Sequence, residues 1–568
     1  MEIAAGQKSV QDRSDDNLAK QLGLSIPTLL LVGGFSLLYF ADVLLRASEK
    51  YWWYDEIFTI YACRLPTLNA LWDALSHGFE FNPPLFYILT NASQSVFGEG
   101  LISSRLPQII AFWILCLSLF RFVNRRSGAM AGLIAMTLPM LTTAYFYAYE
   151  ARPYGIILGF TGLALVCWQM SIEQPRSRLW LVSFSGFLLG ALLLHCYALL
   201  VVVPFAVAEV FRTIRSRRIN WPMFVALTIP TVIAASTYVP LVIAYKSLAG
   251  GTDFEAGGRA GWAHFVYFYV FLLAPCVLLA TFALALLVVN RAKKFLGFVA
   301  PAPVRGAEHT ALELVLGLSF LALPAFGVIC AKLAHGPVIV RYFLPTLIGL
   351  CIVLGNLFGT GKTALLVRAS LALVIALLLG DRFGRLVWHR YHGQGENLIE
   401  PISGRPMNTT SGHPLDRYGL LVSEAANSTV PIGVLTQWDF VYLIQYAPQL
   451  VPRLYFLTSS ENSFFFRAFR ELRPWFAVKY NVQLTTREFR RLAPDFLIYG
   501  LYRDDALNTL STITQTGRAI KFLKVSDGHF LAEVVTQTTA RPDPRNQNPA
   551  NHDRRIYQHE RPPSPAVY

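Results

Sequence analysis

Long apolar segments separated by short polar loops constrain this chain more than any other feature. The hydrocarbon core of a bilayer is about 30 Å thick, and a helix of roughly 20 apolar residues spans it. Segments of about this length lie at residues 24–45, 104–123, 128–148, 153–171, 179–194, 196–212, 222–244, 264–290, 311–333, 338–358 and 363–381. We therefore expect an all-α polytopic membrane domain over residues 24–381, with about 11 transmembrane helices.

The composition agrees with a membrane protein and argues against a nucleic-acid partner. The chain is 54% hydrophobic and 15% charged, whereas soluble domains carry about 25% charged residues. A net charge of +14 would suit nucleic acid, but most Lys and Arg residues before the C-terminal tail lie in short loops between apolar segments. Basic residues in such loops are typical topology signals and lipid headgroup contacts.

The loop charges predict the topology of the membrane domain. With residues 1–23 in the cytoplasm, every basic cluster between apolar segments falls on the cytoplasmic side, as the positive-inside rule requires. Segment 83–98 is short and half polar, so we expect an amphipathic helix along the interface. A crossing there would move all later basic clusters outside. Eleven crossings therefore place residues 382–568 on the outer face.

The region after the last apolar segment has the pattern of a small α/β extracytoplasmic domain, which we place at residues 382–536. Strands are predicted at Tyr418–Val422, Ile432–Thr436, Phe496–Tyr499, Phe522–Val525 and Phe530–Val535, and helices at Asp439–Tyr446 and Phe464–Val482. Residues 537–568 are rich in Pro, Asn, Arg and Gln without periodicity, which predicts a disordered tail.

Three features of the predicted outer face carry candidate functional residues. The first is loop 46–103, which opens with the run Tyr51-Trp-Trp-Tyr-Asp-Glu. Aromatic rings favour the headgroup level, so the two acids that follow them should lie at the membrane surface. The polar candidates are Asp55, Glu56, His77, Glu80 and Asn82 in this loop, Glu150, Arg152 and Tyr154 in the turn 147–154, and Lys332, Arg341 and Tyr342 around the start of the segment at 338.

Each feature also has a simpler interpretation. Glu150 and Arg152 would form an interfacial ion pair of little energetic value, Arg341 would be a snorkelling arginine, and His77 and Glu80 would be loop surface. Against this, acids on two outer loops and a base on a third suit an anionic, lipid-linked substrate. Cations would bind its phosphate, and a carboxylate would accept a proton from a hydroxyl nucleophile.

Four motifs in this order resemble one family of membrane enzymes: the Asp-Glu pair after the first helix, NPPLFY (82–87), YEARPYG (149–155) and RYFLP (341–345). Together they resemble the GT-C fold glycosyltransferases of the protein mannosyltransferase and aminoarabinose lipid A transferase superfamily, over roughly residues 24–360. The resemblance implies that Asp55 is the catalytic base or acceptor-orienting acid, with Glu56 beside it, and that Arg341 holds the donor phosphate. In the family a His often stands where this chain has Asn82.

The activity implied is transfer of a sugar from a polyprenyl-phosphate donor to an extracytoplasmic lipid, glycan or protein, with inversion at the anomeric carbon. The protein would lie in the inner membrane of a bacterial cell, with its active site on the periplasmic face, and would act on lipopolysaccharide or another cell-envelope glycan. Substrate would contact Glu80, Asn82, Glu150, Arg152, Tyr154, Lys332, Arg341 and Tyr342. No cofactor is certain. Some relatives bind a divalent metal, for which Glu80, His77, His264 and His335 are candidate ligands without a supporting spacing.

Two other classes of function stay open. A multi-pass transporter of a lipid-linked or small anionic substrate places ionisable residues in mid-membrane, in Gly- or Pro-broken helices that repeat between two halves. Here the charges within apolar segments lie toward segment ends, and no such pair of broken helices repeats. A scaffold or receptor would instead read a cell-surface glycan through its outer domain.

Overall fold

The computed structural model describes most of the chain. The described residues are 25–250, 265–273, 281, 307–334, 339–358, 364–392, 418–426, 428–458, 464–476, 478–481, 484–485, 489, 495–501, 509–511, 513–515, 517–526 and 529–536. The chain divides into two compact units. The first comprises residues 1–76, 80–243 and 260–412, and the second comprises residues 77–79, 244–259 and 413–568. Each unit is described by itself below.

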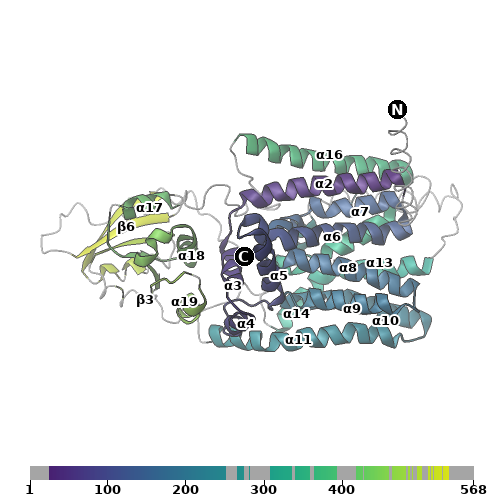
Figure 1. Ribbon diagram of the computed structural model, residues 1–568, viewed down its shortest axis with the longest axis horizontal. Coiled ribbons are helices and arrows are strands. Elements are labelled where there is room, and N and C mark those ends of the chain that lie inside the picture. The colour runs from purple at the N-terminus through teal and green to yellow at the C-terminus, as the bar shows by residue number, and fades with distance from the viewer. Residues whose placement is uncertain are drawn as a thin grey trace, which may run out of the picture. The chain divides into compact units, whose positions relative to one another are not determined.

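The first unit is a bundle of long helices with shorter helices across one end (Figure 1). Its elements are α2 (Ile26–Glu49), α3 (Tyr54–Cys63), α4 (Leu68–Ser76), α5 (Leu85–Phe97), α6 (Leu101–Ser127), α7 (Ala129–Leu141), η1 (Thr143–Tyr149), α8 (Tyr154–Glu173), α9 (Arg178–Leu192), η2 (Cys196–Val201), α10 (Val202–Ser216), α11 (Trp221–Ala249), α13 (Ala307–Leu321), α14 (Leu323–Ala334), η3 (Val340–Phe343), α15 (Thr346–Phe358) and α16 (Ala364–Tyr391). The short helices α3, α4 and α5 lie across one end of the bundle, next to the turns that join the long helices.

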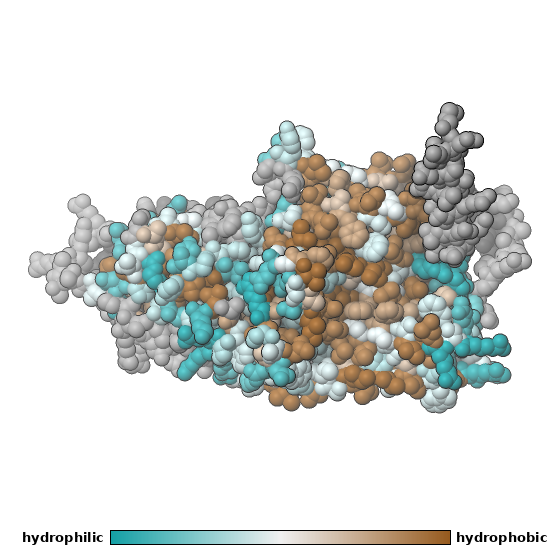
Figure 2. All heavy atoms as spheres, in the orientation of Figure 1, coloured by the Kyte–Doolittle hydropathy of each residue, from teal (hydrophilic) through white to brown (hydrophobic). Residues whose placement is uncertain are grey.

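Several of these helices are long and apolar enough to cross a bilayer. Among the described residues, five qualify by themselves: Ile26–Glu49, Leu101–Ser127, Tyr154–Glu173, Cys196–Ser216 and Trp221–Ala249. Two bent pairs, 129–149 and 309–332, raise the number to seven if each pair is one span. The bundle carries a broad apolar band on its surface (Figure 2). The prediction of a multi-pass, all-α membrane domain is confirmed. The number eleven is not confirmed, and the crossing expected at 264–290 falls largely outside the described residues.

Glycines on one face of α8 let it approach α6 closely. A Cβ atom added to Gly159 would lie 2.4 Å from the carbonyl oxygen of Ala111, and one added to Gly162 would lie 3.0 Å from Cβ of Ser118. Lipid tails are as apolar as the helix surfaces, so membrane helices associate through close packing, which small residues allow. This contact fixes the start of α8, and therefore the turn that precedes it.

The predicted interfacial segment 83–98 is the 13-residue helix α5. It begins directly after Pro83-Pro84, and Pro is tolerated in the first turn of a helix because its missing N–H has no partner there. It ends at Gly98, whose φ of 79° favours glycine. Phe86 and Tyr87 are buried, whereas Val96 and Phe97 are exposed. The helix is too short to cross a bilayer, as predicted.

The second unit contains a mixed α/β sheet. Its described strands are β1 (Ile432–Val434), β2 (Leu454–Thr458), β3 (Leu484–Thr485), β4 (Phe496–Leu501), β5 (Arg518–Ser526) and β6 (His529–Thr536), in the spatial order β3-β2-β1-β4-β6-β5. Strands β1 to β4 are parallel, and β6 runs antiparallel to both β4 and β5. The helices are α17 (Gly419–Ala426), α18 (Gln437–Tyr446), η5 (Pro448–Arg453), α19 (Phe464–Leu472) and η6 (Arg473–Trp475). The small α/β domain is therefore confirmed.

Two of the element predictions in this unit are wrong. The strand expected at Tyr418–Val422 is helix α17, because Tyr418, Leu421 and Ala425 are buried at the helical spacing i, i+3, i+7. The helix expected over Phe464–Val482 stops at Leu472, since Pro474 follows and cannot continue it. Strands β2 and β3 were not predicted. The predicted segments 1–23 and 537–568 lie outside the described residues.

Candidate active site

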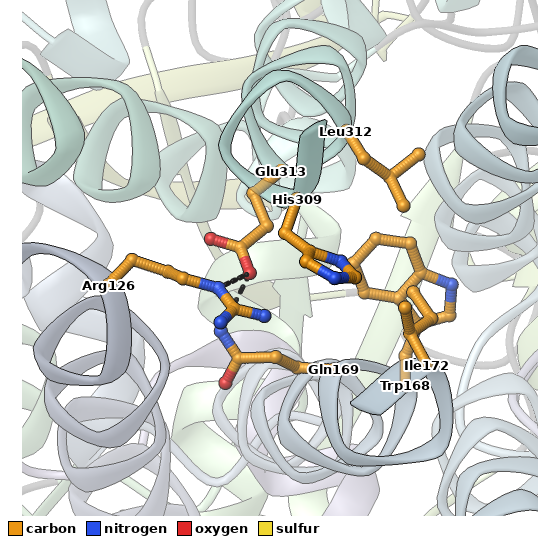
Figure 3. Close-up of a pocket in the computed structure, with 7 residues that line it drawn as sticks. All are labelled: Arg126, Trp168, Gln169, Ile172, His309, Leu312 and Glu313. Atoms are coloured by element: carbon orange, nitrogen blue, oxygen red, sulfur yellow. Dashed lines mark hydrogen bonds and ion pairs between the residues drawn. The ribbon is translucent and has the colours of Figure 1, made fainter. Parts of the chain in front are cut away.

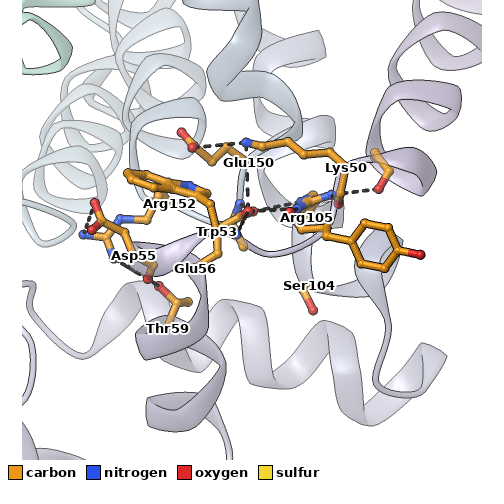
Figure 4. A network of polar contacts seen from close by, with 12 residues as sticks. Lys50, Trp53, Asp55, Glu56, Thr59, Ser104, Arg105, Glu150 and Arg152 are labelled. Atoms are coloured by element: carbon orange, nitrogen blue, oxygen red, sulfur yellow. Dashed lines mark hydrogen bonds and ion pairs between the residues drawn. The ribbon is translucent and has the colours of Figure 1, made fainter. Parts of the chain in front are cut away.

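A network of buried charged side chains lies at the end of the bundle where α3 begins (Figure 4). Its centre is Glu56, whose side chain is fully buried. Arg105 of α6 donates to it from Nε and Nη2, both at 2.8 Å. Nη1 of the same arginine donates to the carbonyl oxygens of Ala47 and Lys50, at 2.7 and 2.6 Å. Arg105 therefore ties the end of α2 and the start of α3 to α6.

Glu56 also binds backbone groups. Its Oε2 accepts from the backbone N–H of Trp53 at 3.3 Å, which caps α3. Its Oε1 accepts from the backbone N–H of Ala151 at 2.5 Å, which fixes the turn before α8. Burial by itself would raise the pKa of Glu56, but the charges of Arg105 and Lys50 and these hydrogen bonds lower it below its usual value. Glu56 is thus an ionised anchor whose two oxygens are both occupied.

A second buried pair joins α2 to the turn before α8. Nζ of Lys50 lies 3.1 Å from Oε1 of Glu150 and 3.9 Å from Oε2 of Glu56. It also lies 3.9 Å from the centre of the Phe146 ring. Burial lowers the pKa of Lys50 and raises that of Glu150. The alternative of an interfacial Glu150–Arg152 ion pair is therefore wrong, because Glu150 is buried against Lys50 and Arg152 pairs with Glu80.

Asp55 has quite different surroundings from its neighbour. Its side chain is 17% exposed, and Oδ2 lies 3.1 Å from Nη1 of Arg341 and 4.0 Å from Nη2 of Arg152. Although Oδ2 is inaccessible to solvent and close to both cations, it accepts no hydrogen bond from the described residues. Ion pairing with Arg341 and Arg152 therefore holds this oxygen.

Arg152 bridges α3 to the loop that follows α4. Its Nη1 donates to Oε1 of Glu80 at 2.7 Å, to Oγ1 of Thr59 at 3.1 Å and to the backbone oxygen of Asp55 at 3.1 Å. Burial raises the pKa of Glu80, although Arg152 opposes the shift. Behind Glu80, Nδ2 of Asn82 lies 3.5 Å from its Oε2. Glu80 is therefore buried in the network, and its interpretation as loop surface is wrong.

Arg341 approaches from η3 and is held by aromatic rings. Its guanidinium carbon lies 5.9 Å from the centre of the Trp53 ring and 5.8 Å from that of Tyr154, which are cation–π distances. The structure thus brings Asp55, Arg152, Tyr154 and Arg341 together from three separate parts of the chain. Lys332 lies in the last turn of α14, and its part in the site stays a prediction.

The proposed metal ligands are not gathered in the described part of the chain. No group of three or more His, Cys, Asp or Glu side chains among those residues lies close enough to hold a metal ion. His77 belongs to the second unit and stacks on Trp475, with 5.0 Å between ring centres. His264 and His335 lie outside the described residues. Binding of a divalent metal by these residues therefore stays a prediction from the sequence.

A separate polar network lies at the opposite end of α6 (Figure 3). Nε of Arg126 and Nε2 of Gln169 both lie 2.9 Å from Oε1 of Glu313. Nη2 of Arg126 lies 2.6 Å from Oε1 of Glu173. Arg126, Gln169 and Glu313, with Trp168, line a narrow hollow that is too small to hold a water molecule. Their ion pairs are made within the protein and join α6, α8 and α13, which indicates a structural role.

Comparison with known proteins agrees with this architecture. Residues 82–240 match the family model of dolichyl-phosphate-mannose-protein mannosyltransferase. The crystal structure of ArnT from Cupriavidus metallidurans bound to undecaprenyl phosphate matches with a TM-score of 0.52 and 13% identity, over 90% of this chain and 99% of that one. This chain has a GT-C fold. The crystal structure of apo ArnT from the same organism matches this chain with a TM-score of 0.54 and 14% identity, over 91% of this chain and 99% of that one. No curated protein sequence matches significantly.

These findings confirm the resemblance to GT-C membrane glycosyltransferases that the four motifs indicate. The region that matches the family model runs from α5 into α11 and contains Glu150, Arg152 and Tyr154. Asp55 and Arg341 lie outside the matched region, and the fold brings Asp55 next to Arg152 of that region and next to Arg341.

Sequence reasoning missed two residues that organise the network. Arg105 lies inside a predicted crossing, and a charged residue in an apolar segment is a signal for a buried partner. Lys50 directly precedes the aromatic run, on a face that carries few basic residues. Both signals are visible in the sequence, although neither identifies the partner.

Proposed function

We propose that this protein is an integral membrane glycosyltransferase that moves a sugar from a polyprenyl-phosphate donor to an extracytoplasmic acceptor at the bacterial inner membrane. The observation that carries the proposal is the Asp55–Arg341 pair. Oδ2 of Asp55, which accepts no hydrogen bond from the described residues, lies 3.1 Å from the guanidinium of Arg341, at the end of an apolar bundle. The GT-C fold and the undecaprenyl phosphate in the ArnT structure support a lipid-phosphate donor.

The donor phosphate would bind to Arg341. A guanidinium binds phosphate through two parallel hydrogen bonds, and phosphate is the better competitor for a cation that a single carboxylate holds at one nitrogen. Trp53 and Tyr154 lie at cation–π distance from the guanidinium. Its Nε makes no hydrogen bond among the described residues, and its Nη1 is paired with Asp55. Donor binding would therefore separate Arg341 from Asp55 and leave Asp55 free for the acceptor.

Asp55 would activate or orient the acceptor. In the step we propose, the acceptor oxygen forms a bond to the anomeric carbon while the bond from that carbon to the phosphate oxygen breaks. The phosphate leaves with the electron pair, and Asp55 accepts the proton of an acceptor hydroxyl. A single displacement of this kind inverts the anomeric carbon. A phosphate acceptor is already ionised, so Asp55 would then act through position and charge alone.

The other candidates support this pair. Glu56 would position Asp55, because it anchors the first turn of α3 to α6. Arg152 would keep the backbone of Asp55 in place and contribute positive charge, balanced by Glu80. Substrate contacts of Glu80, Asn82, Glu150, Lys332 and Tyr342 stay part of the proposal, as do the boundaries 24–381 for the catalytic domain and 382–536 for the outer domain.

The test is transfer by the purified protein in detergent. Radiolabelled sugar should move from a polyprenyl-phosphate donor to a glycolipid extract of the cell envelope, and the label should not move without protein. If no transfer occurs but the protein reconstituted in liposomes carries the labelled lipid or a small anion across the bilayer, the transporter alternative would replace the enzyme.

A further inference from the structure

Three tyrosines and one histidine form a cluster of rings that contacts Arg341 through Tyr154. We call this cluster the aromatic subsite: Tyr154, His195, Tyr197 and Tyr342. The rings of Tyr197 and Tyr342 stack, with 3.9 Å between their centres and 12° between their planes. The His195 ring lies 5.0 Å from that of Tyr342 and 5.4 Å from that of Tyr154. Since Tyr154 also contacts Arg341, the subsite adjoins the cation that we assign to the donor phosphate.

The hydrogen bonds of His195 define its tautomer. Nδ1 accepts from the backbone N–H of Tyr197 at 3.1 Å, so a neutral ring carries its proton on Nε2. The residue is only 7% exposed. The side-chain hydrogen bonds recorded for it within the described residues both involve Nδ1, the second being a weak contact with Sγ of Cys196. Within the described residues, Nε2–H therefore has no hydrogen-bond acceptor and can donate to a ligand.

His195 stays neutral because of its surroundings. Burial lowers its pKa, and the positive charges of Arg152 and Arg341 lower it further, to about 3. A ring with this pKa is uncharged throughout the physiological range, so it neither supplies nor takes up a proton in catalysis. It offers one hydrogen-bond donor at a fixed position, like the neutral imidazoles that polarise oxygen atoms in other enzymes.

The groups around the subsite favour one class of ligand. His195 and the two guanidiniums offer hydrogen-bond donors, which oxygen atoms accept. An ammonium group has three donors and no acceptor, so it cannot accept from Nε2–H of His195. Aromatic ring faces attract cations, but Arg341 already lies over the ring of Tyr154. Tyrosine rings suit the apolar face of a sugar ring, and a hydroxyl or carboxylate oxygen suits the donors.

We propose that the aromatic subsite binds the sugar of the lipid-linked donor, that Nε2–H of His195 donates to a sugar oxygen, and that the subsite selects an uncharged or acidic sugar over a cationic amino sugar. This inference rests on the proposed function, which concerns the lipid phosphate and the acceptor. It adds a binding site for the sugar of the donor, whereas Arg341 contacts the phosphate.

Binding of lipids with and without a sugar tests the inference. The probes are undecaprenyl phosphate alone, the same lipid carrying a neutral hexose, and the same lipid carrying a 4-amino sugar. We expect the wild-type protein to bind the hexose lipid at least about 10-fold more tightly than the amino-sugar lipid. An ammonium group cannot accept the hydrogen bond of His195 Nε2–H, and it carries the same charge as the nearby guanidiniums.

Substitutions at His195 identify its contact. His195→Phe keeps a flat ring but removes the donor, and it should weaken binding of the hexose lipid by about 10-fold while leaving binding of undecaprenyl phosphate within about twofold. His195→Gln stays uncharged and offers an N–H at a similar reach, so it should restore most of the loss. The exposed His392, which directly follows α16, provides the control, since His392→Phe should change no affinity.

The outcomes separate the inference from the proposed function. Equal weakening of all three lipids in His195→Phe, with no rescue by Gln, would mean that His195 only supports the fold. Unchanged binding of the hexose lipid would remove the sugar contact, and tighter binding of the amino-sugar lipid by the wild type would overturn the selectivity. If the wild type bound none of the lipids, the proposed function itself would fail.

Discussion

Two acids that are adjacent in the sequence have different tasks in this protein. Successive residues of an α-helix point about 100° apart, so at the start of α3 Glu56 faces Arg105 while Asp55 faces Arg341. Both oxygens of Glu56 are occupied by protein donors. Asp55 keeps an oxygen that accepts no hydrogen bond from the described residues. The sequence predicts an acidic pair at the membrane surface, but only the packing of α3 against α6 distinguishes the two residues.

Removing the charge of Glu56 should destabilise the protein. Glu56→Gln leaves the buried guanidinium of Arg105 without its counter-ion, and breaking a buried pair in this way typically costs about 3–5 kcal/mol. We expect a lower midpoint of thermal unfolding in detergent for Glu56→Gln than for Asp55→Asn. Equal midpoints for the two variants would contradict the assignment of Glu56 as the anchor.

The loss of stability at acidic pH should depend on the carboxylate of Glu56. The pKa of Glu56 is lower in the folded protein than its ordinary value of 4.5. Its stabilising contribution is therefore fully present above that ordinary value and is lost as the pH falls through the folded pKa. Thermal unfolding of the wild type should shift to lower temperature as the pH falls below the ordinary pKa of 4.5, and Glu56→Gln should show a smaller shift. An equal shift in both proteins would assign the acid sensitivity to other groups.

Substitution of Arg341 should weaken binding of the donor phosphate. Arg341→Ala should weaken binding of undecaprenyl phosphate by about 10-fold or more, since a charged hydrogen bond contributes about 1.5–3 kcal/mol, and Arg341→Lys should recover part of it. The control is Arg385→Ala, because Arg385 is an exposed arginine of α16 that pairs with Asp381. If both alanine variants bound the lipid like the wild type, Arg341 would be a snorkelling residue after all.

At the scale of elements, close packing of α8 on α6 places the turn that carries Glu150 and Arg152. Gly159→Leu would force side-chain atoms against the backbone of Ala111. Overpacking of this kind typically costs about 1–3 kcal/mol, and a displaced turn should also reduce transfer. Gly186 of α9 has no atom within 4 Å of an added Cβ, so Gly186→Leu should preserve the melting temperature and the activity. Similar losses in both variants would exclude a specific packing effect.

The elements themselves could largely be predicted from the sequence, because hydropathy records the length of an apolar helix directly. The pairing of side chains could not. Lys50 and Glu150 lie 100 positions apart, and no periodicity links them. The break at Thr142 between α7 and η1, with a bend of 76°, lies within one continuous apolar run. Tyr418–Val422 was misread because a short apolar run fits a strand or a helix equally well.

At the scale of the whole molecule, the distribution of Arg and Lys predicts one orientation in the membrane. The N-terminus and the loop around residue 218 should be cytoplasmic, and a position near residue 400 should be outside. Fusions of a reporter that is active only in the cytoplasm should give signal at 218 and none at 400. Signal at 400 would contradict the odd number of crossings and the proposed periplasmic side of the active site.

The central claim is that Asp55 acts on the acceptor while Arg341 holds the donor. Single-turnover transfer by purified Asp55→Asn, measured across pH with undecaprenyl-phosphate sugar bound beforehand, tests it most directly. We predict a loss of about 10²–10⁴-fold in rate, with donor affinity and thermal midpoint near those of the wild type. If the acceptor is a phosphate, the loss should show little dependence on pH. Transfer at close to the wild-type rate by a well-folded Asp55→Asn protein would contradict the account.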